Sequence, residues 1–199
     1  MLEQRIQQHF IDSADLKYQS AQALSLPIEA AVQAMLACIT GGGKILTCGA
    51  GISAAQAQTF AALCVSGFER DRPELAAVAL SSEGGYLGSI SGAATPTAHY
   101  YARQVRALGQ AGDVLMVFTV SGNEASMQEA VEAAHERDMI VVLLTGSTGG
   151  TLANVLRETD VLICISHDRP ARVREAHGLV LHCLCDGIDT QLLGEQEML

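Results

Sequence analysis

Apolar positions near the start of the chain recur with the spacing of amphipathic helices. Between residues 2 and 20 they fall at Leu2, Ile6, Phe10, Ile11 and Leu16. A second helix is expected to begin near Pro27, since proline is favoured in a first helical turn, and to end at residues 41–43, which are all glycine. We expect these leading helices (2–41) to lie in an oligomer interface, although covering one face of a sheet is an equally simple role.

After residue 43 the pattern changes to short continuous apolar runs that alternate with longer amphipathic stretches. Continuous apolar runs are typical of parallel strands that are covered on both faces. Their alternation with helices predicts an α/β fold with a five-stranded parallel sheet between two helical layers. The expected strands are 44–48, 75–80, 113–120, 139–145 and 160–165, and the expected helices are 53–67, 98–108, 124–136, 151–157 and 170–193. The stretch 81–97 is the least regular, and we expect a short helix between loops there.

The first predicted strand ends in a glycine-containing turn that leads into a helix of small residues. Gly49 and Gly51 allow the backbone to bend sharply and to approach a ligand closely. Ser53 is expected to cap the helix, because its hydroxyl can accept a hydrogen bond from a free N–H group of the first turn. Free N–H groups and the positive end of a helix suit an anion, so this turn is a candidate anion site.

The strand 113–120 is followed by a second turn of the same kind. Thr119, Ser121 and Asn123 offer hydroxyl and amide groups at the start of the next helix. Such groups suit a phosphate ester, but plain turn formation and helix capping would use the same residue types. Glu124 weighs against a phosphate, because its carboxylate would repel a second anion at the same N–H groups. In a parallel sheet both turns lie at one edge, where α/β sheets bind ligands.

Composition and charge limit the possible functions. The chain has 199 residues, which favours one domain, and a net charge of −10, which disfavours direct nucleic-acid binding. We expect no transmembrane segment and no signal peptide, because no apolar run looks long enough and the chain begins Met-Leu-Glu-Gln-Arg. The six cysteines fall mostly inside predicted elements, which indicates buried thiols and a cytoplasmic location.

Other candidate motifs carry less information. Residues 49–54 fit a loose dinucleotide-binding pattern, but no acidic residue follows at the required spacing of about 20 residues. The six histidines are best interpreted as structural, since His177 and His182 are five residues apart and do not share a helix face. We therefore expect no metal ligand set. Glu83 and Glu175 could act as acid or base, although solvated carboxylates are more usual.

The chain resembles the sugar isomerase (SIS) domain family over nearly its whole length. The closest branch is that of phosphoheptose isomerase and the related DnaA initiator-associating protein. The resemblance implies a five-stranded parallel sheet, a homotetramer and, in the isomerases, conversion of sedoheptulose 7-phosphate to a heptose phosphate, often with zinc. The residues that carry it are Cys48–Ser53, Gln104–Leu115, Val120–Asn123, the Leu-Thr-Gly of 144–146 and Arg172–His177.

The resemblance also implies where a sugar phosphate would bind. The phosphate positions of the family correspond here to Ser53, Thr119, Val120, Ser121 and Glu124. The family typically has serine or threonine at each of the last four. Val120 and Glu124 therefore depart from the pattern. From these residues we predict a ligand-binding set of Ser53, Thr119, Ser121 and Asn123.

Most catalytic positions of the family hold residues that cannot transfer protons. The catalytic glutamate corresponds to Leu63 and the metal-binding histidine to Thr59. The substrate-binding Asn-Asp pair falls near residues 92–93, which are Gly-Ala, and the phosphate arginine falls at Gly67. Only the histidine of the last helix is retained, as His177, and it is the single catalytic candidate.

These losses lead us to expect a non-catalytic adaptor of the initiator-associating type, acting in replication initiation. Leu192 and Leu193 would contact the protein partner, although packing on the chain's own core is an equally simple role. Two alternatives stay open. One is an active phosphoheptose isomerase, the one reading under which zinc would be expected, in which Glu83, His99 or His177 supplies the chemistry. The other is a sensor that binds a sugar phosphate without converting it.

Overall fold

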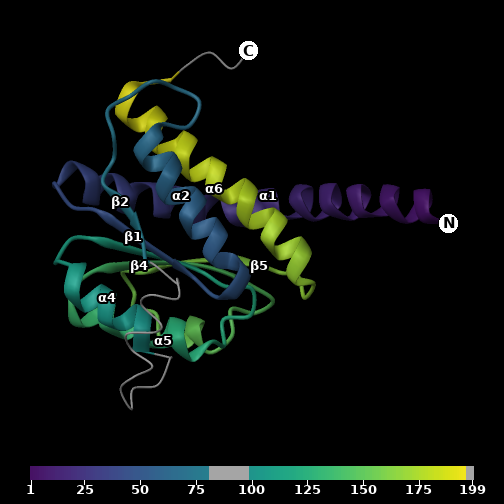
Figure 1. Ribbon diagram of the computed structural model, residues 1–199. Coiled ribbons are helices and arrows are strands. Elements are labelled where there is room, and N and C mark those ends of the chain that lie inside the picture. Colours follow the sequence, from purple (N-terminus) through teal and green to yellow (C-terminus); the bar gives the residue numbers. More distant parts are fainter. Residues whose placement is uncertain (81–98, 196–199) are drawn as a thin grey trace.

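A computed structural model describes residues 1–80 and 99–195 of the chain, and it shows a three-layer α/β sandwich (Figure 1). The five strands are parallel, in the order β2-β1-β3-β4-β5. The strands are β1 (Ile45–Gly49), β2 (Ala77–Ala79), β3 (Val114–Phe118), β4 (Ile140–Gly146) and β5 (Val161–Ile165). The helices are α1 (Leu2–Thr40), α2 (Ala54–Ser66), α4 (Tyr100–Leu108), α5 (Ala125–Glu136) and α6 (Pro170–Leu193). The predicted fold class is confirmed.

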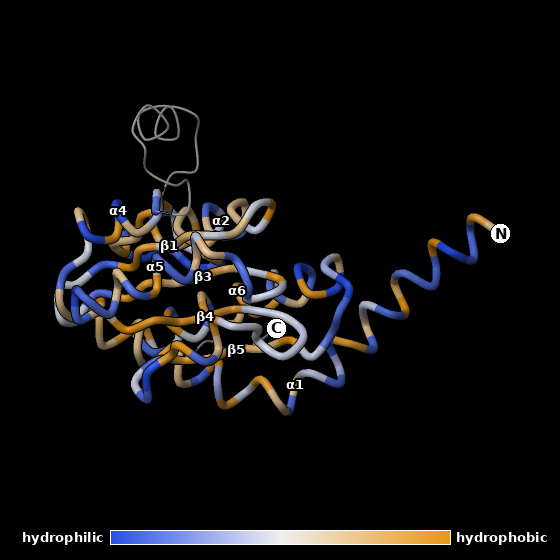
Figure 2. Tube along the Cα trace, turned by 90° about the horizontal axis from the view of Figure 1, so that it is seen from below, coloured by the Kyte–Doolittle hydropathy of each residue, from blue (hydrophilic) through white to orange (hydrophobic). Residues whose placement is uncertain are grey.

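Alternate residues of the central strands enter two separate hydrophobic layers. In β3, Val114, Met116 and Phe118 pack with α1, α2 and α6, whereas Leu115 and Val117 pack with α4 and α5. Every residue of β1 and β3 is buried. Figure 2 shows the strands as a mostly apolar centre between the helices. Burial on both faces explains why these strands have no polar alternation in the sequence.

The leading segment is one helix, so the prediction of two helices is wrong. Pro27 lies inside α1 and lacks the N–H that would donate to the residue four positions earlier. Packing of the second half of α1 holds the helix together across this position. Ala31, Val32 and Met35 are buried against the sheet and α6. Tertiary packing here outweighs the preference of proline for a helix start.

By length and composition α1 could cross a membrane, which corrects the expectation that no apolar stretch is long enough. This is weak evidence, because the core helix of a water-soluble protein passes the same test. The buried residues of α1 belong to the same core cluster as β3 and α6. We therefore assign the apolar character of its second half to packing within the protein.

One further difference concerns a short element, and one expectation cannot be compared with the structure. The helix expected at 151–157 is a 3₁₀ turn, Leu152–Asn154. The helix expected within 81–97 lies outside the described residues, as does Glu83.

A buried ion pair fixes the segment before β2 against α6. The guanidinium of Arg72 donates to Asp189, and both side chains are at most 2% exposed. Arg72 also donates to the carbonyls of Leu63 (3.0 Å) and Cys64 (2.7 Å), near the end of α2. One side chain thereby joins α2, α6 and the entry to the edge strand.

Candidate functional site at the strand tips

The turn after β1 approaches the neighbouring turn closely. Gly51 has φ +53°, and a side chain at Gly49 would overlap the backbone of Ser53. The N–H of Ala50 donates to the carbonyl of Phe118 at 2.9 Å, which joins this turn to the end of β3. Glycine is needed at position 49 for lack of space and is favoured at position 51 by its positive φ, and the hydrogen bond from Ala50 places the first two turns side by side.

Ser53 is not the helix cap that the sequence predicted. Its backbone has helical angles (φ −67°, ψ −11°), because it ends a 3₁₀ turn, Gly51–Ser53, that runs directly into α2. A capping residue needs extended angles to aim its oxygen at the first turn, and no side-chain capping bond forms here. Ser53 is nevertheless buried, at 1% exposure, between this turn and α2.

The turn after β3 encloses the carboxylate of Glu124. The hydroxyl of Thr119 donates to one carboxylate oxygen at 2.5 Å, and the hydroxyl of Ser121 donates to the other at 2.8 Å. The N–H of Asn123 donates to the same carboxylate at 3.1 Å. The three groups that a phosphate would use are thus brought together, and an anion of the chain itself already lies among them. Val120 instead packs against the core.

The Asn123 side chain joins the second turn to the loop after β4. Its carbonyl oxygen accepts a hydrogen bond from the N–H of Thr151 at 3.0 Å. Its amide donates to the carbonyl of Ser121 at 3.1 Å. A side chain at Gly122 would overlap the carbonyl of Gly149, so these loops are in direct contact. Asn123 therefore has a structural role in addition to the binding role predicted for it.

His177 lies beneath the strand tips on α6 and is completely buried. Its Nε2 lies 3.1 Å from the carbonyl of Thr145, and a carbonyl can only accept, so Nε2 carries the proton. Nδ1 is then the basic nitrogen, and it is buried without a partner among the described residues. Burial lowers the pKa of His177 to about 4, an effect that Arg174 reinforces and the Thr145 carbonyl opposes. At neutral pH this side chain is an uncharged imidazole with a free lone pair.

Gln56 is a site residue that the sequence did not reveal. It lies in the first turns of α2 and donates to the carbonyl of Arg174 on α6 at 2.9 Å. Its own amide oxygen is buried without a partner among the described residues. Nothing in the local pattern of small residues distinguishes Gln56 from Gln58, because the distinction arises only when α2 packs on α6.

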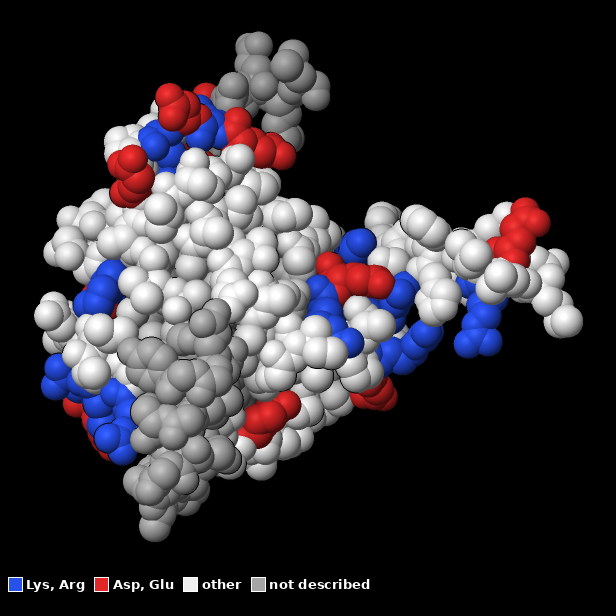
Figure 3. All heavy atoms as spheres, in the orientation of Figure 1, with Lys and Arg blue, Asp and Glu red and all other residues white. Residues whose placement is uncertain are grey.

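The exposed face of α2 carries no ionisable side chain. Thr59 is exposed and its hydroxyl donates to the carbonyl of Ala55, whereas Leu63 packs partly into the core. The surface over α2 is accordingly free of acidic and basic groups (Figure 3). Of the positions that the resemblance assigns to catalysis, only that of His177 presents a group that can exchange a proton within the described residues.

Other histidines and the candidate acid Glu175 have partners outside this site. His135 pairs with Asp160 at 2.7 Å, His99 pairs with Glu129 at 3.1 Å, and His182 stacks on Phe68. Glu175 accepts a hydrogen bond from Arg172. No group of three or more His, Cys, Asp or Glu lies close enough to hold a metal ion within the described part of the chain.

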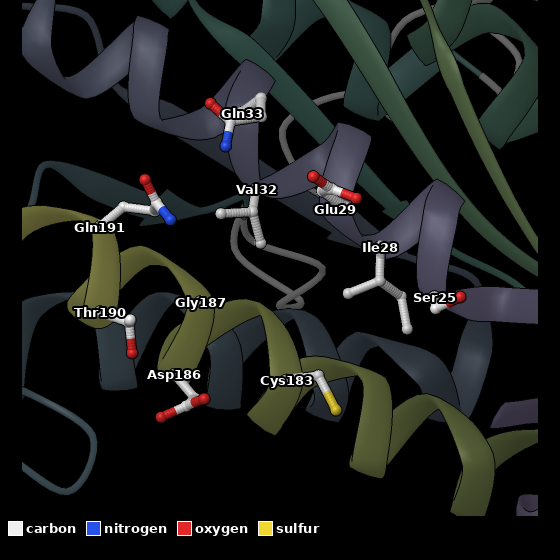
Figure 4. A pocket seen from close by; sticks show the side chains of 10 residues that line it. All are labelled: Ser25, Ile28, Glu29, Val32, Gln33, Cys183, Asp186, Gly187, Thr190 and Gln191. Atoms are coloured by element: carbon white, nitrogen blue, oxygen red, sulfur yellow. The ribbon is translucent and has the colours of Figure 1, made fainter. Parts of the chain in front are cut away.

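A separate pocket of about 280 Å³ lies between α1 and α6 (Figure 4). Ile28 and Val32 line it from α1, and Cys183 and Thr190 line it from α6. Its charged lining residues, Glu29 and Asp186, are both acidic. A phosphate would be repelled there, so the strand tips are the better candidate for an anionic ligand.

Comparisons with known proteins show the family to which the chain belongs. The SIS domain profile matches residues 9–146. The chain belongs to the SIS domain family. It lies in the phosphoheptose isomerase branch, since a phosphoheptose isomerase of Methylibium petroleiphilum is 56% identical over 198 residues, covering 100% of this chain and 98% of that relative.

Solved structures give the same result. The structure of phosphoheptose isomerase GmhA from Neisseria gonorrhoeae superimposes with a TM-score of 0.89 at 45% identity, covering 96% of this chain and 100% of that one. A phosphoheptose isomerase from Francisella tularensis gives 0.90 at 37% identity, covering 96% and 99%. Both structures therefore cover nearly the whole chain.

The expectation of a non-catalytic, initiator-associating adaptor is wrong. Relatives between 45% and 56% identical over at least 96% of the chain carry the name phosphoheptose isomerase. The expectation gave too much weight to the losses at Thr59, Leu63, Gly67 and residues 92–93, whereas proton-transfer groups need only reach the substrate and can come from other elements. Leu192, to which it gave a partner role, packs partly against the core, and Leu193 is 44% exposed.

Proposed function

We propose that the chain is a phosphoheptose isomerase that interconverts sedoheptulose 7-phosphate and the corresponding aldose phosphate. The observation that carries this proposal is the 56% identity to a phosphoheptose isomerase over the full chain. A binding protein without catalysis has no comparable support, because the relatives that are 45% to 56% identical to this chain are named as phosphoheptose isomerases.

The phosphate of the substrate would bind at the turn after β3. Thr119 and Ser121 supply hydroxyl donors, Asn123 supplies a backbone N–H, and α5 begins directly after the turn. Backbone and hydroxyl donors at a helix start are suited to a phosphate ester. Ser53, on the adjoining turn, is the fourth residue of the proposed ligand-binding set.

His177 would accept a proton during the reaction. Isomerisation between a ketose and an aldose moves one proton between adjacent carbons and another between their oxygens, so it needs groups that accept and return protons. The neutral ring with its Nδ1 lone pair is in the form required of an acceptor, and Thr145 holds the ring in that tautomer. Glu83 follows β2 in the sequence, outside the described residues, and is the acid that we assign to the second transfer.

The described residues do not fit a zinc ion, which the resemblance associates with the isomerases. The metal-binding position on α2 holds Thr59, whose hydroxyl is already donated to the carbonyl of Ala55 and does not replace an imidazole, and the nearby catalytic position holds the alkyl side chain of Leu63. We therefore assign no step of the reaction to a metal.

The protein would act as a homotetramer in the cytoplasm, with no nucleic acid or membrane as partner. All six cysteines lie within the described residues and are free thiols, in keeping with a reducing compartment. The exposed apolar residues of α1 support an assembly of several copies.

The proposal is tested by incubating the purified chain with sedoheptulose 7-phosphate and measuring aldose phosphate formation. We expect turnover, and we expect His177→Asn to lower kcat at least about 100-fold, the effect typical of losing a proton-transfer group. His182→Asn, an exposed position on the same helix, is the matched control and should retain the wild-type rate. Absence of turnover by the folded wild-type chain would contradict the proposal.

A further inference from the structure

The Glu124 side chain turns away from its own helix and into the preceding turn. Glu124 directly precedes α5 and has extended backbone angles (φ −80°, ψ 122°), yet it makes no side-chain capping bond to that helix. Both carboxylate oxygens instead accept hydrogen bonds from the turn, at 2.5 Å from Thr119 and 2.8 Å from Ser121. The carboxylate is therefore bound by the turn in the way that an anionic ligand would be.

These bonds occupy the hydroxyl donors of Thr119 and Ser121. A carboxylate only accepts, so each hydroxyl must donate its single proton to Glu124. The Thr119 oxygen also accepts from the N–H of Gly122 at 3.1 Å, and Thr119 is completely buried. A phosphate, which likewise needs donors, can use these hydroxyls only if Glu124 leaves.

Charge leads to the same conclusion. A phosphate monoester carries about −1.5 to −2 charges at neutral pH, so it is repelled by a carboxylate in the same turn. Glu124 is half-buried and the neighbouring Asn123 is exposed, so the carboxylate lies at the edge of the turn that faces solvent. Since the two anions compete for one set of donors, occupancy by one excludes the other.

We infer that Glu124 is a built-in competitor for the phosphate subsite, which sets the affinity for phosphosugars because the substrate phosphate must displace its carboxylate. This inference rests on the proposed function for the identity of the ligand. Glu124 thus lowers the affinity for every ligand that binds through a phosphate, inorganic phosphate and phosphosugars alike.

The test is calorimetric titration of the full-length chain with inorganic phosphate and, separately, with sedoheptulose 7-phosphate. Glu124→Ser should lower the Kd for inorganic phosphate at least about tenfold, because charge-assisted hydrogen bonds to two hydroxyls become available without competition. Glu124→Gln, which keeps the shape but not the charge, should lower it less. Glu132→Gln removes the same charge from an exposed position of α5 and should leave the Kd unchanged.

A stability measurement separates this role from a purely structural one. Without phosphate, Glu124→Ser should have a lower melting temperature than the wild type, since the turn has lost its anion. Phosphate should raise the melting temperature of Glu124→Ser by more than that of the wild type. If phosphate shifts both proteins equally, or if their Kd values agree within twofold, the inference is wrong.

The outcomes also distinguish this inference from the proposed function. Turnover of sedoheptulose 7-phosphate by the wild type, with no tighter binding by Glu124→Ser, would overturn the inference alone. Tenfold tighter phosphate binding by Glu124→Ser, with no turnover by the wild type, would support the inference and overturn the isomerase proposal. No phosphate binding by any variant would overturn the inference.

Discussion

At the scale of single residues, the buried imidazole of His177 links the candidate chemistry to the stability of the protein. Burial lowers its pKa to about 4 from an ordinary value of 6.5. The unfolded chain therefore binds a proton between pH 6.5 and pH 4 that the folded chain does not. Stability from this group is complete above pH 6.5 and is lost as the pH falls toward 4.

We predict that about 3 kcal/mol of the unfolding free energy that is present at pH 7 is lost by pH 4 through His177 alone. Urea unfolding of the wild type and of His177→Gln at several pH values measures this contribution. The unfolding free energies of the wild type and of His177→Gln should converge as the pH falls from 6.5 to 4. The unfolding free energy of His182→Gln should change with pH as that of the wild type does, because the His182 ring is exposed. If the unfolding free energy of His177→Gln changes with pH as that of the wild type does, the assignment of this pH dependence to His177 is wrong.

Glu124 shows how far the sequence predicts the candidate site at this scale. The residue types of the turn indicate an anion site, and the position of Glu124 at a helix start indicates a conflict with phosphate. That its carboxylate accepts bonds from both hydroxyls depends on rotamers and on the fold of the turn, which residue types alone do not specify. The same holds for Gln56 and for the Nδ1 of His177, which has no partner in the described part of the chain, since both depend on the packing of α2 against α6.

At the scale of elements, the contact between α2 and α6 depends on the buried ion pair of Arg72 and Asp189. Arg72 holds the end of α2 and the side of α6 together, and one oxygen of Asp189 has no partner among the described residues. Replacing Arg72 would leave a buried carboxylate without its counter-ion, which is much more costly than losing an exposed pair.

We therefore predict that Arg72→Leu lowers the free energy of unfolding by about 3 to 5 kcal/mol. Arg72→Leu/Asp189→Leu should recover part of this loss, since no unpaired charge remains. Arg106→Leu is the control, because its pair with Glu136 is exposed and should contribute little. Denaturant unfolding measures all three, and equal small effects of Arg72→Leu and Arg106→Leu would contradict the prediction.

The elements themselves were largely predictable, and the errors have identifiable causes. Strands β1, β3, β4 and β5 follow directly from continuous apolar runs. The break expected near Pro27 does not occur, because the buried second half of α1 holds the helix together. The edge strand β2 is only Ala77–Ala79, shorter than the apolar run 75–80, because only Ile45–Thr47 of β1 pairs with it. Local pattern predicts the existence of an element, whereas its ends depend on its neighbours.

At the scale of the whole molecule, the first part of α1 projects beyond the sheet (Figure 1). Leu2, Ile6 and Phe10 are 73%, 50% and 75% exposed and lie four residues apart, on one face of the helix. An exposed apolar stripe of this kind is costly in water and is typical of a surface that another chain covers. We propose that other copies of this chain cover it in a homotetramer.

Replacing Ile6 and Phe10 together with Asp should therefore lower the oligomeric state, because two charges would have to be buried in the interface. Gln7→Asp adds a charge to an exposed polar position of the same helix turn and should leave the tetramer intact. Light scattering coupled to size-exclusion chromatography measures both. An unchanged mass for Ile6→Asp/Phe10→Asp would show that this stripe is not in the interface.

The central claim is that this chain moves protons on a sugar phosphate. The most direct measurement is NMR of sedoheptulose 7-phosphate in D₂O with the purified wild-type chain. We predict that the aldose phosphate forms and that deuterium enters at the carbon next to its carbonyl, because a group on the protein exchanges its proton with solvent between abstraction and return. A ketose that stays unconverted and unlabelled at micromolar concentrations of folded protein would contradict the claim.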